Sequence, residues 1–245
     1  MKIHKKEIND MGYEVKELTF FFVNAWIIKG EKTVLFDTGA VVEPDQLEGF
    51  LAENGVDPKE IDYIVISHAH WDHFGLVQKW KELSGAKVIC HKNAVEFLKT
   101  GKKDLPFDFN YTPAPEQYEI FKNFMMTTRM MEIPPVDPDI VIGDEGLDMH
   151  EYGIPGKLMY TPGHADSAIA LVMDDRTCFT GDTIVDLHTI QCLEEFYPEG
   201  TYSLNWIRMD NETIANSVRK LLEVADNFNG GHGVPYTRAD IEKLV

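Results

Sequence analysis

The stretch Ser67-His-Ala-His-Trp-Asp-His73 holds three imidazoles and one carboxylate within seven residues. Such groups are costly to bury unless hydrogen-bond partners or an opposite charge satisfy them. The stretch is therefore either a solvated surface loop or a set of side chains that surrounds a cation.

The neighbouring residues bring these side chains together. Residues 63–66 read as a short apolar strand, and an extended backbone directs His68 and His70, two residues apart, to one side. Asp72 and His73 follow where the chain turns into the next helix, and from there they can point toward the same volume. A cluster of this composition predicts a metal site.

Three later segments each carry one further side chain of a ligand type. They are Thr161-Pro-Gly-His164, Gly181-Asp182-Thr183 and Gly230-Gly-His232-Gly233. In each, glycine allows the backbone to turn sharply after an apolar strand, which leaves one His or Asp at the end of the strand. Together with the first cluster they supply five histidines and two aspartates. Seven ligands are too many for one tetrahedral zinc, and they suit two ions that share a bridging ligand.

The remaining pattern predicts the fold class. Strands are expected at 16–22, 25–29, 33–37, 63–66 and 87–90 and near residues 140, 147, 158, 169 and 178, and helices at 43–54, 74–84, 93–100, 116–131 and 211–225. Because strands precede helices in each half, we predict an α+β fold, an αββα sandwich of two packed mixed β-sheets with helices on the outer faces. We expect one domain over residues 1–245, with a helical insertion at about 104–135 and an irregular loop at about 187–209 near the site.

Charge and composition limit the partners. The formal charge of -18 should repel nucleic-acid phosphates and anionic membrane surfaces, so no nucleic-acid and no membrane partner is expected. The longest apolar stretch, Phe20 to Ile28, is interrupted by Asn24 and is too short to span a bilayer. With no secretory signal and three cysteines that lack C-x-x-C spacing, we expect a cytoplasmic protein. Its partner would be a small-molecule substrate, and it could form a homo-oligomer.

The order of the candidate ligands resembles that of the metallo-β-lactamase superfamily. The shared pattern is H-x-H-x-D-H at His68, His70, Asp72 and His73, followed by His164, Asp182 and His232. The turn Asp37-Thr-Gly39 is similar to the early D-T-G turn of that family, so the resemblance covers essentially the whole chain. These motifs identify the fold specifically. They say little about the substrate, because many hydrolases share them.

This resemblance implies a dinuclear metal centre. It assigns His68, His70 and His164 to one ion, Asp72, His73 and His232 to the other, and Asp182 to both. The cofactors implied are two divalent metal ions, zinc first, with iron or manganese as alternatives because imidazole and carboxylate suit all three. Asp37 would support a ligand histidine by accepting its distal N–H.

The chemistry implied is hydrolysis by a hydroxide that bridges the two ions. Two cations lower the pKa of a bridging water from about 15.7 to about 7 and polarise the substrate oxygen. Asp72 and Asp182 would orient the hydroxide. Lactonases of this family carry a Tyr shortly after the bridging Asp, whereas this stretch reads Thr183-Ile-Val-Asp-Leu-His188. His188 is our candidate for the third catalytic residue, with Tyr197 or a metal-bound water as alternatives.

We therefore expect a dinuclear metal-dependent hydrolase that acts on a small, fairly apolar ester, thioester or lactone. Four methionines between Met125 and Met131 would give the insertion an adaptable apolar surface, which favours an apolar substrate. A phosphodiesterase of the ribonuclease Z type and a non-haem iron oxidoreductase or dioxygenase use similar ligands and stay as alternatives. The flavodiiron pattern replaces the second His by Glu, whereas His70 stands here. A degenerate binding protein would have lost ligands, and all seven are present.

Overall fold

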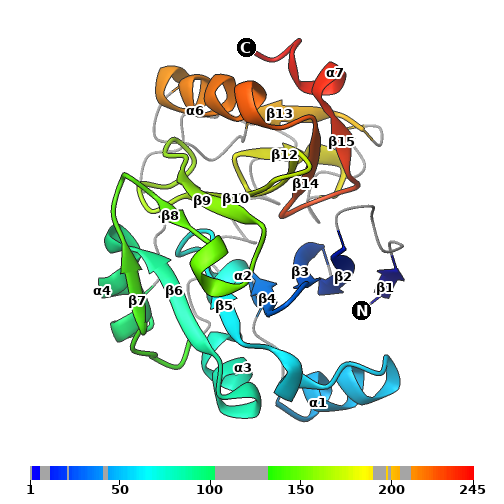
Figure 1. Cartoon of the computed structure of the whole chain (residues 1–245), viewed down its shortest axis with the longest axis vertical. Helices are drawn as coiled ribbons and strands as arrows, with labels where there is room; N and C mark the ends of the chain where they lie inside the picture. The colour runs from blue at the N-terminus through cyan, green and yellow to red at the C-terminus, as the bar shows by residue number, and fades with distance from the viewer. Residues whose placement is uncertain are drawn as a thin grey trace.

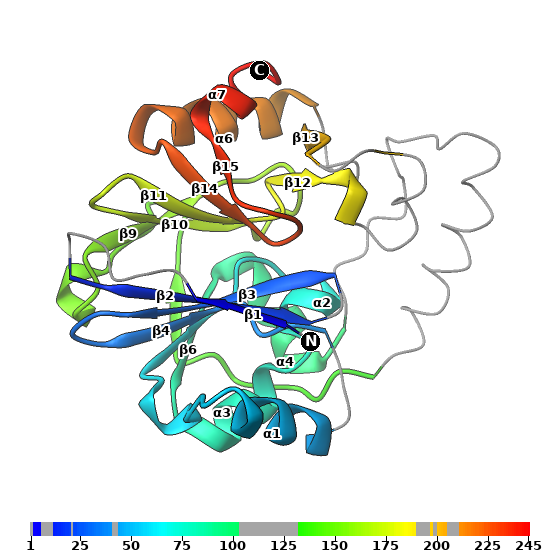
Figure 2. The same cartoon turned by 90° about the vertical axis from the view of Figure 1, so that its right-hand side faces the viewer.

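The computed structural model describes residues 2–5, 12–20, 22–40, 44–102, 132–189, 197, 200–204 and 211–245. Within these residues two β-sheets lie face to face, and helices cover their outer faces (Figures 1 and 2). In Figure 2, α6 (Asn211–Val224) and α7 (Arg238–Ile241) lie above the second sheet, and α1 (Pro44–Glu53) and α3 (Val77–Ser84) lie below the first. The predicted α+β sandwich is confirmed.

The first sheet contains seven strands in their order along the chain. They are β1 (Lys2–Lys5), β2 (Glu14–Phe20), β3 (Val23–Lys29), β4 (Thr33–Phe36), β5 (Tyr63–Val65), β6 (Lys87–His91) and β7 (Ile140–Ile142). Strands β1 to β4 are antiparallel, and β4 to β7 run parallel to one another. Parallel neighbours need crossover connections, so the helices between β4 and β7 cover one face of this sheet. These helices are α1, α2 (Trp71–Phe74), α3 and α4 (Val95–Thr100), with the short 3-10 helices η1 (Pro58–Glu60) and η2 (Lys92–Ala94).

The second sheet contains six strands in the order β15-β14-β11-β10-β9-β8. They are β8 (Leu147–Asp148), β9 (Gly156–Tyr160), β10 (Ile169–Met173), β11 (Thr177–Gly181), β14 (Asn227–Gly230) and β15 (Tyr236–Thr237), and the 3-10 helix η3 (His150–Tyr152) lies between β8 and β9. All neighbours are antiparallel except β11 and β14. Because β9, β11 and β14 share one direction, the loops that follow them leave the sheet at the same edge.

The core between the sheets follows from the two-residue period of the strands. In β3, Trp26 and Ile28 face the second sheet, while Ala25 and Ile27 face the helices on the other side. The Trp26 ring lies 5.6 Å from the ring of Phe179 in β11, which joins the two sheets. Strand β3 is buried on both faces except at its last residue, as expected for a strand in the centre of a sandwich.

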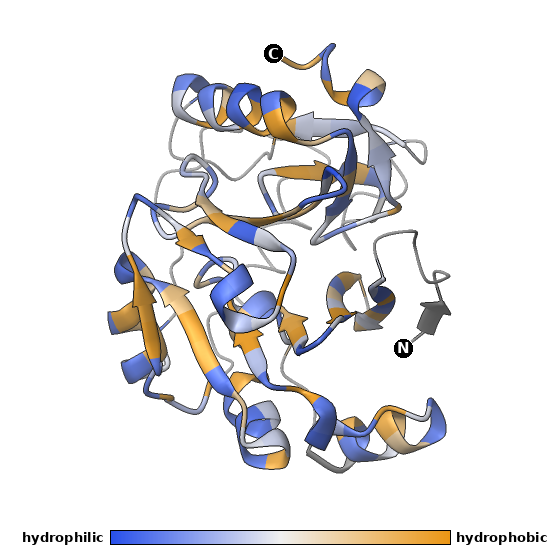
Figure 3. Ribbon diagram, viewed as in Figure 1, coloured by the Kyte–Doolittle hydropathy of each residue, from blue (hydrophilic) through white to orange (hydrophobic). Residues whose placement is uncertain are grey.

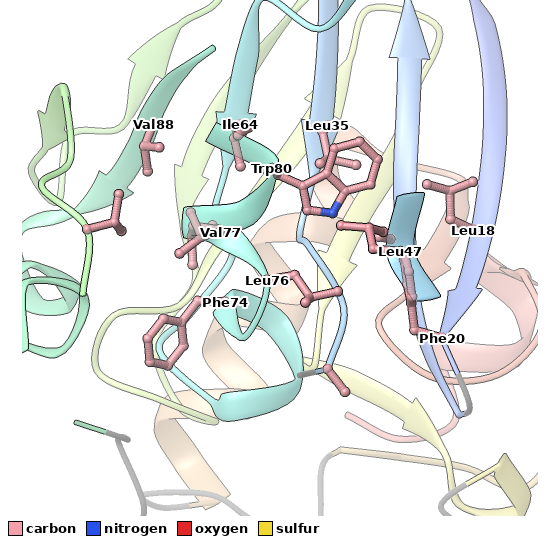
Figure 4. Packing of buried hydrophobic residues seen from close by; sticks show 14 of the residues in the cluster. Leu18, Phe20, Leu35, Leu47, Ile64, Phe74, Leu76, Val77, Trp80 and Val88 are labelled. Atoms are coloured by element: carbon pink, nitrogen blue, oxygen red, sulfur yellow. The ribbon is translucent and has the colours of Figure 1, made fainter. Parts of the chain in front are cut away.

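The outer faces are covered by amphipathic helices. Trp80 of α3 and Leu47 of α1 lie beside Leu35 and Ile64 of the first sheet (Figure 4). On the other side, α6 packs one apolar stripe against β10 and β14. Apolar and hydrophilic residues alternate along this helix (Figure 3). Its buried residues are Ile214, Ser217, Val218, Leu221 and Leu222.

Several predicted boundaries differ from the structure. The helix expected at 74–84 is two helices, because a first turn, α2, already begins at Trp71 inside the motif and α3 starts only at Val77. A small additional sheet pairs β12 (Ile184–Asp186) with β13 (Tyr202–Leu204), so the segment expected to be irregular at 187–209 contains a strand as well as the 3-10 helix η4 (Leu187–Thr189). The predicted helix 116–131 and most of the expected insertion at 104–135 lie outside the described residues.

No helix among the described residues is long and apolar enough to cross a membrane.

Candidate metal centre

The seven predicted ligands meet at one edge of the sandwich. His68 and His70 follow β5, and Asp72 and His73 belong to α2. The other three follow strands of the second sheet: His164 after β9, Asp182 after β11 and His232 after β14. All seven are buried, with at most 7% of each residue exposed.

Hydrogen bonds tie these loops to one another, both between the two sheets and within the second sheet. The amide of Ile169 donates to the Ser67 carbonyl at 2.9 Å, and the amide of Gly231 donates to the Gly181 carbonyl at 2.7 Å. The Ala69 amide, between His68 and His70, donates to the hydroxyl oxygen of Ser167 at 3.4 Å. The ligand loops therefore form one connected unit.

The first candidate group consists of His68, His70, His164 and Asp182. The Nε2 atom of His164 lies 3.0 Å from His68 Nε2 and 2.8 Å from His70 Nδ1. It also lies 3.6 Å from Asp182 Oδ2. Two nitrogens on a tetrahedral zinc, each bound at about 2.0–2.1 Å, are about 3.3 Å apart, so these separations are close to those of a shared ion.

The second candidate group consists of Asp72, His73 and His232. Asp72 Oδ2 lies 3.5 Å from His232 Nε2, and Asp72 Oδ1 lies 3.9 Å from His73 Nε2. The carboxylate of Asp182 reaches this group as well, with Oδ1 at 3.2 Å from His73 Nε2 and Oδ2 at 3.2 Å from His232 Nε2. Asp182 thus lies between the two groups.

The tautomers of the ligand rings show that the site fits a cation. His73 Nδ1 lies 2.9 Å from Asp37 Oδ2, and His232 Nδ1 lies 2.8 Å from the Phe22 carbonyl oxygen. Both partners are acceptors, so in each ring Nδ1 carries the proton and Nε2 presents a lone pair. These lone pairs face the carboxylate oxygens of Asp182, and acceptors this close need a proton or a metal ion between them.

His68 is oriented in the same way. The Ser67 hydroxyl donates to Asp37 Oδ2 at 2.7 Å, so its oxygen accepts from His68 Nδ1 at 2.9 Å. The Nε2 lone pair of His68 then points at His164. Asp37, expected to support one ligand histidine, therefore orients His73 directly and His68 through Ser67.

The pKa values of the ligand side chains shift in different directions in the two groups. Burial, followed by the neighbouring imidazoles, lowers the pKa of His68 and of His70 well below the usual 6.5. Burial by itself lowers the pKa of His73, but the carboxylates of Asp182, Asp72 and Asp37 together raise it well above that value. Burial raises the pKa of Asp182, but His232 and His73 outweigh it and hold that pKa well below its usual value. His68 and His70 are thus neutral, the form of imidazole that binds metals. His73 and Asp182 form a charged pair in which a cation could replace the proton.

Two glycines let the backbone pass close to these side chains. A Cβ atom at Gly231 would overlap Asp182 Oδ1 and lie 2.6 Å from His73 Cε1. Gly181 has φ of +52° and faces Ser67 Oγ, which would lie 2.6 Å from an added Cβ. The loops can therefore bring Asp182 and His232 to the site only with glycine at these positions.

His188 lies in other surroundings. Its Nδ1 donates to the Tyr197 carbonyl oxygen at 2.7 Å, and its backbone amide donates to Asp186 Oδ1 at 3.2 Å. These hydrogen bonds hold the ring within its own loop, next to the β12–β13 sheet. The catalytic role of His188 stays a prediction.

Asn24, Phe22 and Ser67 also belong to the site, although no role was predicted for them from the sequence. Asn24 Nδ2 donates to the Gly233 carbonyl oxygen at 2.8 Å, and the Phe22 ring stacks on the His232 ring at 5.5 Å. The available signal for Asn24 was a polar residue inside the apolar stretch Phe20 to Ile28. No comparable signal distinguished Phe22 from other core aromatics.

Comparison with known proteins decides the family. A family model described as the metallo-beta-lactamase superfamily matches residues 18–227. The chain belongs to the metallo-β-lactamase superfamily. Within it, the metallo-beta-lactamase fold-containing protein ST1585 of Sulfurisphaera tokodaii is 31% identical over 164 residues, 64% of this chain and 55% of that protein. The crystal structure of ST1585 has a TM-score of 0.61 at 21% identity and covers 98% of this chain and 83% of that chain.

One further relative is named as a reductase, and one structural neighbour contains iron. An anaerobic nitric oxide reductase flavorubredoxin of Pectobacterium carotovorum is 38% identical over 95 residues, 38% of this chain and 18% of that protein. The crystal structure of TTHA1623 in a di-iron-bound form has a TM-score of 0.61 at 20% identity and covers 93% of this chain and 96% of that chain. At this identity the structural matches show the fold alone. The chain spans between 17% and 55% of the length of the curated relatives it matches.

Proposed function

We propose that this protein is a dinuclear metal-dependent hydrolase that acts on a small, fairly apolar ester, thioester or lactone. The observation that carries the proposal is the position of Asp182. Its two carboxylate oxygens lie 3.2 Å from ligand nitrogens of the second group, and one of them also lies 3.6 Å from His164 of the first. A carboxylate between two sets of imidazoles suits two cations, because its negative charge offsets their mutual repulsion.

The residues divide between two ions. His68, His70 and His164 would hold one, Asp72, His73 and His232 the other, and Asp182 would contact both. Two divalent cations bound there would lower the pKa of a shared water to about 7 and polarise the carbonyl oxygen of the substrate. The carboxylates of Asp72 and Asp182 would accept hydrogen bonds from the attacking water and so orient its lone pair. In its doubly protonated form His188 would give the Nε2 proton to the leaving group, while the Nδ1 proton stays hydrogen-bonded to the Tyr197 carbonyl oxygen.

The surroundings of the second group favour an apolar substrate. The partly buried Phe22 ring lies parallel to the His232 ring, with an interplanar angle of 13°. Trp71 meets the Phe22 ring edge-on at 6.0 Å. Aromatic rings next to the ions would contact an apolar acyl chain and exclude bulk water from the reacting bond.

Zinc is the proposed metal, and iron is the alternative with specific support. One structural neighbour of this chain is a di-iron-bound protein, and the flavorubredoxin relatives are named as nitric oxide reductases, which supports iron as the alternative. An iron centre would favour an oxidoreductase or dioxygenase in place of a hydrolase.

The decisive experiment is elemental analysis of the protein purified without added metal. It is followed by activity assays with lactone, thioester, phosphodiester and sulfate-ester substrates. We expect about two metal ions per chain and turnover of lactones or thioesters that a chelator abolishes. Binding should also raise the unfolding temperature, because the ions bind the folded chain in preference to the unfolded one. His70→Ala should lose both hydrolysis and metal occupancy, whereas His150→Ala, a surface histidine outside the site, should keep both. Two irons with oxygen consumption and no hydrolysis, or hydrolysis of the phosphodiester alone, would contradict the proposal.

A further inference from the structure

The start of β3 contacts the loop that carries His232, although the two belong to different sheets. The amide of Asn24 donates to the Gly231 carbonyl oxygen at 2.7 Å, and Trp26 Nε1 donates to the Gly230 carbonyl oxygen at 3.3 Å. The Phe22 carbonyl oxygen accepts from His232 Nδ1 at 2.8 Å. The short stretch from Phe22 to Trp26 thus contacts Gly230, Gly231 and His232.

The side chain of Asn24 is the central contact. Its Nδ2 donates to the Gly233 carbonyl oxygen at 2.8 Å and approaches the Gly230 carbonyl oxygen at 3.5 Å, so it bridges the two ends of the turn. Its Oδ1 accepts from the Thr19 hydroxyl at 3.2 Å. These partners also fix the orientation of the amide, because the reversed amide would place Oδ1 against carbonyl oxygens. The residue is 2% exposed, so water does not replace these hydrogen bonds.

The turn held by Asn24 has little rigidity of its own. Glycines flank His232 on both sides, at Gly231 and Gly233, and glycine loses more conformational freedom on ordering than any other residue. Gly231 cannot carry a side chain because of its approach to Asp182 and His73. The rigidity that the turn lacks must therefore come from a neighbouring element, and Asn24 supplies it from β3.

We propose that Asn24 is a positioning residue for the second metal ion. By joining the carbonyls of Gly230 and Gly233, it holds His232 with Nε2 toward Asp72 and Asp182. It contacts none of His68, His70 and His164 in the hydrogen bonds of the described residues, so it sets the affinity of the second ion and leaves that of the first unchanged. The inference rests on the proposed dinuclear function.

The test is a stepwise metal titration of the full chain with Zn²⁺ in competition with a chromogenic chelator, repeated with Co²⁺ for its visible spectrum. The variants are Asn24→Leu, which keeps the branching at Cγ and removes the donor, and Asn24→Asp, which keeps the shape and places a carboxylate against the carbonyls. We expect the second binding constant to fall about 10- to 100-fold, the range seen when a group supporting a ligand is lost, with the first constant unchanged.

Two control variants separate positioning from general destabilisation. Asn54→Leu removes an amide that donates to the Phe50 carbonyl oxygen at 2.7 Å at the end of α1, far from the ligands, and should leave both constants unchanged. Thr19→Val removes the partner of Asn24 Oδ1 but keeps the Nδ2 contacts, and should change the second constant less than Asn24→Leu does. The ion retained at the first group reports that the Asn24 variants are folded.

Each result is decisive. Selective weakening of the second ion supports the inference, and Asn24→Asp provides this result even if Asn24→Leu does not fold. An equal fall in both binding constants overturns the inference, and so do two unchanged constants in a folded variant. A wild-type chain that binds fewer than two ions overturns the proposed function, and with it the inference, before any variant is measured.

Discussion

Asp37 Oδ2 lies 2.9 Å from His73 Nδ1, and the same oxygen accepts the hydroxyl proton of Ser67, whose oxygen faces His68. One carboxylate therefore fixes the tautomer of one candidate ligand in each metal group. Asp37 adopts φ of +61°, an uncommon conformation for a residue with a side chain. Its backbone amide and both carboxylate oxygens are hydrogen-bonded, which is how the surrounding structure holds it there.

Asp37→Asn should weaken the binding of both metal ions. An amide offers one acceptor oxygen in place of two and would turn an N–H donor toward the donors of Ser67 or His73. We expect both stepwise binding constants to fall about 10- to 100-fold, in contrast to the selective loss expected for Asn24 variants. The measurement is the same competition titration.

Asp57→Asn is the matched control for this change. Asp57 accepts the Lys59 amide at 2.9 Å on the surface, at the start of η1. This variant should leave both constants unchanged. Loss of the second ion alone in Asp37→Asn would show that the Ser67 link to His68 does not matter for binding of the first ion.

Gly231→Ala should remove the second metal site while the sheets remain intact. The added methyl group would overlap Asp182 Oδ1 and His73 Cε1, and overpacking of this kind costs about 1–3 kcal/mol. Metal content and unfolding temperature check the prediction. Gly49→Ala is the control, since nothing lies within 4 Å of its added Cβ in α1, where Ala should stabilise the helix by roughly 0.5–1 kcal/mol. Two bound ions in Gly231→Ala would contradict the close approach described above.

His150 should make the stability of the fold depend on pH. Hydrogen bonds to Asp174 and then Asp148 raise the pKa of this exposed ring above 6.5. Between 6.5 and the raised pKa the folded chain binds more protons than the unfolded chain, so stability falls as pH rises through that window. The contribution is therefore complete below pH 6.5, while the two carboxylates stay ionised, and is lost above the folded-state pKa.

The measurement is the unfolding temperature of wild type and His150→Gln across this pH range. We expect the wild type to be the more stable of the two at about pH 6 and the difference to shrink toward about pH 9. Asp174→Asn should remove part of this pH dependence, because it removes the carboxylate partner of His150 Nε2 at 2.8 Å and leaves the Asp148 contact with Nδ1 in place. A difference that is the same at both ends of the range would show that the ion pairs do not form in solution.

Much of the site was predictable because the ligands stand in short, unusual patterns. The cluster from His68 to His73 concentrates groups that are costly to bury, and His164, Asp182 and His232 each follow an apolar strand next to glycine. The helix that begins inside the cluster was not predictable in the same way. The sequence predicts a start at Phe74, whereas Trp71 to Phe74 already form a helical turn, and all four residues are buried.

Contacts made far along the chain escaped prediction for a different reason. Asn24 lies 209 residues from Gly233, and β12 pairs with β13 across the segment that was expected to be irregular. Neither partner carries a local periodicity that points to the other. A hydrogen bond between a side chain and a distant carbonyl depends on how the sheets stack, which a single sequence pattern does not report.

The sequence by itself determined the kind of chemistry, because the types of ligand and their order along the chain already specify which atoms can hold a cation. Only the tertiary structure decided how those atoms are oriented, since the proton on each imidazole is assigned by a partner such as Asp37, Ser67 or Phe22 that becomes its neighbour when the two sheets close.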